Sequence, residues 1–178
     1  MNKTLLSGLL VTLFSLISLT GCGGGSGGGE TPQPPASQAT KAVLTLSVQG
    51  TVPPATQIGG IEVVVNFPPG VTAKAVPAPA NPAIMVADTG VVTVTGGAAG
   101  AEVVNGTIAT TPTPAFALDL RIIKSGGFAT GNIAIVNCDI SSGVHPAAAD
   151  FSLANFKAVD LNGVPLPGLT VGFTAEIQ

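Results

Sequence analysis

Apolar residues occupy every second position along much of the chain from residue 41 onward. The clearest stretch is Ile61–Phe67, in which only Glu62 and Asn66 carry strongly polar side chains, and both fall on the same phase. A two-residue period of this kind is typical of a β-strand that buries one face. Valine, isoleucine, threonine and alanine dominate these stretches, and the 24 glycines and 15 prolines of the chain keep them short. The sequence therefore favours an all-β domain.

Short strands separated by turns follow one another through this part of the chain. The strands are expected near 42–49, 61–67, 71–76, 91–95, 103–110, 116–122, 131–140, 151–158 and 171–177. Pro77–Pro82 is predicted to be a loop, Ser125–Gly127 to end a strand, Pro146–Asp150 to make one helical turn and Asp160–Gly163 to make a tight turn. A β-bulge is expected near Ala154–Asn155, and Asn105-Gly106 is either a hairpin turn or a bulge. Eight or nine such strands bury their apolar faces as a two-sheet antiparallel β-sandwich with jelly-roll or Greek-key connections.

The first residues of the chain follow a different pattern. Lys3 precedes the apolar run Leu5–Leu19, and the small residues Thr20 and Gly21 then lead to Cys22. These are the parts of a secretory signal, and the run is short for a membrane span of about 20 residues. The stretch Leu19-Thr20-Gly21-Cys22 resembles the lipobox of bacterial lipoproteins. The resemblance implies that residues 1–21 are a signal peptide and that Cys22 carries diacylglycerol and a fatty acid such as palmitate.

The residues after Cys22 indicate where such a protein is held. Gly23, rather than Asp, follows the cysteine, and this resembles the outer-membrane sorting signal of Gram-negative lipoproteins. We therefore expect a lipid-anchored cell-envelope protein, at the outer membrane if the source is Gram-negative. Residues 22–40 are rich in glycine and proline and are expected to be a flexible tether. Residues 41–178 remain for one folded domain.

Three stretches of this domain resemble cohesin-like domains. They are Ile58–Phe67 with the following Pro-Pro-Gly turn, Gly131–Ile140, and Phe151–Gly163 with the strand after it. Cys138 stands where the family usually has an aromatic residue. The resemblance implies a nine-stranded jelly-roll of the carbohydrate-binding type and non-catalytic binding of a dockerin-like protein module. The resemblance does not identify any residue of this sequence as one that contacts a partner.

The domain offers few groups for catalysis or metal binding. His145 is the only histidine of the chain, and Cys138 is the only cysteine outside the lipobox. Neither forms the clusters that zinc requires, and Asp160–Gly163 is only a fragment of a calcium-binding loop. No nucleophile motif supports a Ser-His-Asp arrangement with Asp139 or Asp150. We expect no cofactor, no metal and no enzymatic activity, and a buried rather than a reactive Cys138.

The remaining function classes are kinds of binding. A net charge of −3 excludes the basic footprint that nucleic acid requires. A polysaccharide partner is the alternative to a protein partner, but sugar-binding faces usually use aromatic side chains and the chain has no Trp or Tyr. Protein binding is therefore favoured over carbohydrate binding, with a hydrolase as the least favoured class. The predicted binding residues are Phe128, Ile133 and Ile135, if they form an exposed apolar face.

Overall fold

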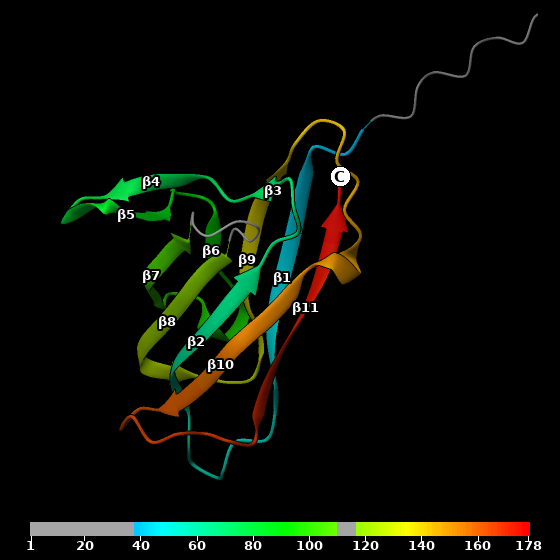
Figure 1. The fold of residues 1–178 in the computed structure, drawn as a ribbon. Helices are drawn as coiled ribbons and strands as arrows, with labels where there is room; N and C mark the ends of the chain where they lie inside the picture. The colour runs from blue at the N-terminus through cyan, green and yellow to red at the C-terminus, as the bar shows by residue number, and fades with distance from the viewer. Residues whose placement is uncertain (1–37, 110–116) are drawn as a thin grey trace, which may run out of the picture. The chain divides into compact units, whose positions relative to one another are not determined.

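A computed structural model of the chain describes residues 38–109 and 117–178 (Figure 1). The predicted signal peptide, the lipobox with Cys22, and the tether as far as residue 37 lie outside the described residues. Within the two described ranges, no helix has the length and apolar character needed to cross a membrane.

The described residues form strands and single helical turns. The strands are β1 (Lys41–Gly50), β2 (Ile58–Asn66), β3 (Val71–Thr72), β4 (Ala75–Ala78), β5 (Asn81–Ala87), β6 (Val92–Val94), β7 (Glu102–Ala109), β8 (Ala117–Phe128), β9 (Gly131–Ile140), β10 (Ser152–Asp160) and β11 (Leu169–Ile177). Two 3₁₀ turns, η1 (Gly96–Ala98) and η2 (Ala148–Asp150), lie between them. The helical turn predicted before Phe151 is therefore confirmed.

The strands form two antiparallel sheets. In the first sheet β1 lies between β11 and β9, and both β3 and β6 pair with the other edge of β9. The second sheet has the order β10-β2-β8-β7-β5-β4. The chain passes repeatedly from one sheet to the other, which keeps most sequential strands in different layers. The predicted two-sheet sandwich is confirmed, with eleven strands in the described part of the chain rather than eight or nine.

The core lies between the sheets and follows the two-residue period. Alternate residues of β1, β2 and β8 point inward and are almost completely buried: Leu44, Leu46, Val48, Val63, Val65, Leu118, Leu120 and Ile122. Each such side chain contributes about 1.5–3 kcal/mol when removed from water. Phe151 and Phe173 add an edge-to-face contact, with ring centroids 6.5 Å apart. Apolar burial from both layers therefore holds the sandwich together.

Bulges interrupt the ladders where the sequence period changes phase. The pairing of β10 with β2 shifts between Ala154 and Lys157, and Asn155 lies there with a φ of 53°. Asparagine tolerates this left-handed conformation better than most residues, and the predicted bulge is confirmed. The pairing of β7 with β8 shifts between Val103 and Asn105. Asn105 and Gly106 both pair with β8, so the hairpin turn is wrong; the strand contains a bulge, and its unpaired residue is Val104.

Two predicted interruptions are wrong. Pro77–Pro82 belongs largely to the β4–β5 hairpin, because β4 is the last strand of its sheet and proline is tolerated at a free edge. Ser125–Gly127 does not end β8. Ile123 pairs with Gly60 and Phe128 pairs with Ile58, so the residues between them bulge outward and the strand resumes.

Candidate functional site

Two of the three predicted binding residues do not lie on the surface. Phe128 is 3% exposed and Ile133 is completely buried. Phe128 turns inward after the bulge in β8. Ile133 is the extra residue of a bulge in β9, since Ala134 pairs with Leu46 and Asn132 pairs with Ser47. The prediction that these residues form an exposed face is wrong for Phe128 and Ile133.

Ile135 is the third of these residues, and it lies on the outer face of the first sheet. It is partly buried between Thr45 of β1 and Thr93 of β6, with which it pairs. A single half-covered isoleucine among threonines forms no extended apolar patch. Leu19, Thr20, Gly21 and Cys22 lie outside the described residues, so their roles stay predictions.

The outer face of the second sheet carries a hollow at Gly60. This Gly60 notch has a volume of about 190 Å³ and is lined by Gly60, Ile61, Glu62, Arg121, Ile123, Lys157 and Val159. Its floor is open because glycine has no side chain: a Cβ at this position would meet Ile123 and Val159 at 3.6 Å. Ile123 is 48% exposed beside it. The notch is a shallow apolar depression on an exposed sheet face.

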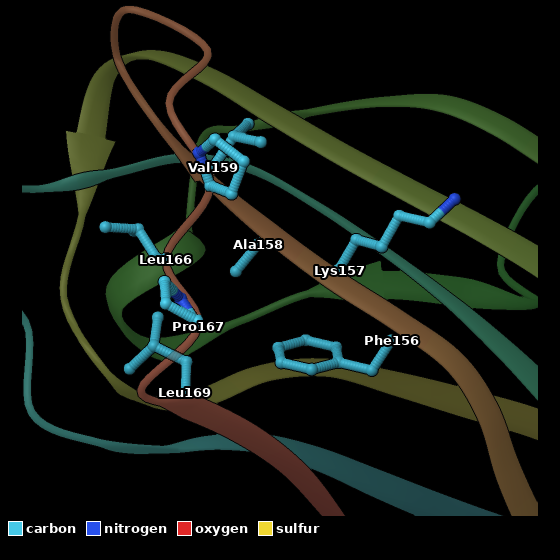
Figure 2. A pocket seen from close by; sticks show the side chains of 8 residues that line it. Phe156, Lys157, Ala158, Val159, Leu166, Pro167 and Leu169 are labelled. Carbon is cyan, nitrogen blue, oxygen red and sulfur yellow. The ribbon is translucent and has the colours of Figure 1, made fainter.

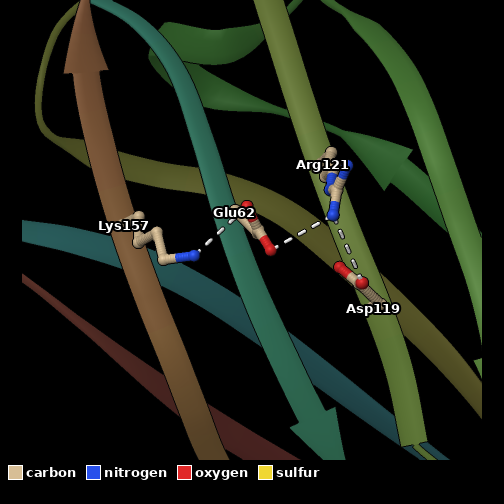
Figure 3. A network of polar contacts seen from close by, with 4 residues as sticks. All are labelled: Glu62, Asp119, Arg121 and Lys157. Atoms are coloured by element: carbon tan, nitrogen blue, oxygen red, sulfur yellow. Dashed lines mark hydrogen bonds and ion pairs between the residues drawn. The ribbon is translucent and has the colours of Figure 1, made fainter. Parts of the chain in front are cut away.

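Three charged side chains that line the notch, Glu62, Arg121 and Lys157, form a network of polar contacts with Asp119 (Figure 3). Glu62 of β2 accepts a hydrogen bond from Arg121 of β8 at 3.3 Å, and Lys157 of β10 lies 3.9 Å from the same carboxylate. Arg121 also lies 3.7 Å from Asp119. The Oδ1 atom of Asp119 is buried, and no donor among the described residues forms a hydrogen bond with it. These exposed ion pairs add little to stability, but they place both positive and negative charges beside the apolar notch.

A second hollow lies on the other side of β10 (Figure 2). It has a volume of about 280 Å³, and its lining is mostly apolar, with Phe156 and Leu169 at one end. The segment after the Asp160–Gly163 turn forms its wall, since the Leu166 N–H donates to the Ala158 carbonyl at 2.8 Å. Lys157 and Val159 line both this hollow and the Gly60 notch. Strand β10 therefore separates two adjacent depressions at the edge of the second sheet.

His145 lies in a third depression, of about 480 Å³, together with Asp150 and Ser152. The geometry does not join them into a catalytic triad. Asp150 accepts a hydrogen bond from the Ala147 N–H at 2.7 Å, and Ser152 accepts one from Asn66 at 3.2 Å. Among the described residues, no hydrogen bond links His145 to either. Asp139, the other carboxylate considered, forms an ion pair with Lys41.

Cys138 is buried, as its phase in β9 predicts. Burial, with a smaller effect of the neighbouring Asp139 charge, raises the pKa of its thiol to about 12. A thiol with such a pKa is not a nucleophile at neutral pH. The Asp160–Gly163 segment makes the predicted turn: Asp160 Oδ1 accepts the N–H groups of Asn162 and Val164, each at 2.8 Å. Within the ranges 38–109 and 117–178, no three His, Cys, Asp or Glu side chains lie close enough to hold a metal ion.

The predicted binding residues do not include those of the Gly60 notch. One signal for them exists, since a glycine pair within an alternating strand marks a place where side-chain volume is missing. Arg121 and Glu62 fall on the polar phase of their strands, but their pairing depends on the register of β2 with β8. That register is not readable from either strand alone.

Comparisons with known proteins give one structural likeness. No family model matches the chain, and no curated protein matches it. Among solved structures, the chain is similar to a non-cellulosomal cohesin from the hyperthermophilic archaeon Archaeoglobus fulgidus. The two are 11% identical, with a TM-score of 0.46 over 72% of this chain and 74% of the other.

Proposed function

We propose that this chain is a lipid-anchored, non-catalytic protein of the bacterial cell envelope whose β-sandwich binds a protein partner. The observation that carries the binding role is the Gly60 notch, an apolar hollow beside charged groups on an exposed sheet face. Protein interfaces combine an apolar centre with a polar rim, and arginine is enriched in them. Ile123 and Val159 supply the centre here, and Arg121 is at the rim.

The same surface is less suited to a polysaccharide. Sugar rings usually stack on exposed aromatic side chains, and no aromatic residue of the described ranges lines the notch. The resemblance of three sequence stretches to cohesin-like domains favours a protein module of the dockerin type as the partner.

The anchoring role rests on the sequence Leu19-Thr20-Gly21-Cys22. Acylation at Cys22 would attach the chain stably, because several acyl chains together bind a bilayer far more tightly than one. Growth with a fatty-acid probe tests this role. The chain should become labelled, and the Cys22→Ala variant should not. Label on that variant, or none on the parent, contradicts the anchor.

The binding role is tested by capturing envelope proteins of the source bacterium on the chain and comparing variants by quantitative mass spectrometry. Ile123→Asp places a charge in the apolar centre, and Gly60→Ala fills the floor of the notch without a close contact. Both should lower recovery of the partner by about tenfold, the effect of roughly 1.4 kcal/mol. Thr93→Asp, at an exposed position of the first sheet, is the control and should not change recovery.

Two results would reject the binding role. Equal recovery of every protein by the parent chain and by Ile123→Asp would show that the notch is not the interface. Selective retention on a polysaccharide array without any captured protein would favour the carbohydrate-binding alternative.

A further inference from the structure

The β4–β5 hairpin has an unusual composition for an exposed element. From Ala75 to Ala87 it contains no charged residue, and Asn81 is its only strongly polar one. Met85 and Ala87 pack against the core, but Pro82, Ala83 and Ile84 are exposed, and Ile84 keeps 42% of its surface in contact with solvent. Figure 1 shows the hairpin extending past the neighbouring strand β7. Its tip is therefore an exposed, uncharged apolar surface.

The backbone of this tip has few free hydrogen-bond donors. Pro77, Pro79 and Pro82 have no N–H group, and the Ala83 N–H donates to the Asn81 side chain at 3.1 Å. Unpaired backbone donors are the main cost of moving chain into lipid. The prolines thus lower the cost of placing the tip of the hairpin in an apolar medium.

The base of the hairpin is charged and is tied together. Lys74 and Asp88 form an ion pair at 2.6 Å, and the Asp88 N–H donates to the Lys74 carbonyl at 2.9 Å. Mutual hydrogen bonding raises the pKa of Lys74 and lowers that of Asp88, so both stay ionised at neutral pH. The change from charged base to uncharged tip is therefore sharp.

The base also lies beside the point where the chain enters the domain. Strand β3, which leads into the hairpin, pairs Val71 with Ile140, and the Ile140 N–H donates to the Thr40 carbonyl at 2.9 Å. Lys41 forms an ion pair with Asp139, whose charge in turn acts on Lys74. The residues that precede Thr40 include the predicted tether, so a membrane anchor at Cys22 would be connected to this end of the sandwich.

We propose that the tip of the β4–β5 hairpin inserts into the boundary between headgroups and acyl chains of the bilayer that holds the anchor. The inference rests on the proposed lipid anchor, which would give a weak second contact a high effective concentration. Lipid fits this surface better than a protein does, because the hairpin has no Trp, Tyr or Arg, the residues that dominate protein hot spots.

The test uses the full acylated chain in vesicles of phosphatidylethanolamine and phosphatidylglycerol. Ile84→Cys receives an environment-sensitive fluorophore, and buried Cys138 stays unlabelled. Leu161→Cys is the matched control, since Leu161 is 50% exposed and the β10–β11 turn lies at the other end of the sandwich (Figure 1). We expect a blue shift and quenching by brominated acyl chains at position 84 only. In a second measurement, Ile84→Asp should weaken vesicle binding of the unacylated Cys22→Ser chain about tenfold.

The outcomes separate the two proposals. A chain that does not float with vesicles refutes the anchor, and the labelled Cys22→Ser chain at high lipid concentration then tests the hairpin alone. A chain that floats but shows the same unquenched emission at positions 84 and 161 overturns the insertion. Shielding of position 84 by envelope proteins without lipid would also overturn it, in favour of a protein contact.

Discussion

The bulge in β9 predicts different stability effects for substitutions of two isoleucines in the same strand. Ile133 and Ile135 lie in the same strand, and a simple two-residue alternation would place them on one face. The extra residue at the bulge instead buries Ile133 completely and leaves Ile135 on the outer face. Ile133→Ala removes a fully buried side chain and should lower the free energy of unfolding by about 2–5 kcal/mol. Ile135→Ala should lower it by about 1 kcal/mol or less, because the side chain is only partly buried.

The difference in destabilisation between the two variants reports the difference in side-chain burial, since both variants lose the same intrinsic strand propensity. Urea unfolding followed by far-ultraviolet circular dichroism measures it, because the chain lacks the Trp and Tyr needed for fluorescence. Both variants should keep the slope of the parent and differ in midpoint. Equal destabilisation, or a larger effect at Ile135, would refute the bulged register and return both side chains to one face.

Three further predictions follow from single residues. Cys138, with a thiol pKa raised to about 12 by burial, should resist a thiol reagent in the native chain and react after urea unfolding; rapid native labelling would contradict its burial. Asn155→Val should destabilise the domain by about 1–2 kcal/mol and Asn155→Gly should not, because the φ of 53° suits glycine and strains valine; chemical unfolding compares them. The hydrogen bond from Lys74 holds the pKa of the Asp88 carboxyl below its usual range, so its stabilising contribution is present above the unfolded-state pKa and is lost as the pH falls through the folded-state pKa. Carboxyl NMR should show this pKa rise in Lys74→Met, and an unchanged pKa would refute the ion pair.

The alternating pattern predicts the sandwich because each strand must bury one face. Strand β9 begins and ends where its sequence indicates, and the phases of β1 and β2 correctly identify their buried residues. The Asn155 bulge was also predictable, because the apolar residues on either side of it occupy opposite phases. In each of these cases the information lies within one strand.

The errors arise where pairing between strands decides the result. Pro77 is compatible with a strand only because β4 is at an edge, and Phe128 turns inward only because Ile58 pairs with it after a bulge. The Gly60 notch combines residues from β2, β8 and β10, whose order in the sheet differs from their order in the chain. A candidate surface of this kind depends on the pairing register between strands. The two-residue period within a single strand carries no information about that register.

The position of β1 between β9 and β11 sets a lower limit on when the domain can fold. Strand β1 can pair with one neighbour only after Ile140 has been synthesised and with the other only after Ile177. Contacts between such distant segments form late, because the intervening loop must close first. A growing chain therefore cannot complete its first sheet before Ile177 has been synthesised. For the lipoprotein that we propose, which would leave the cytoplasm as an unfolded polypeptide, this topology would keep the chain unfolded until most of it had been synthesised.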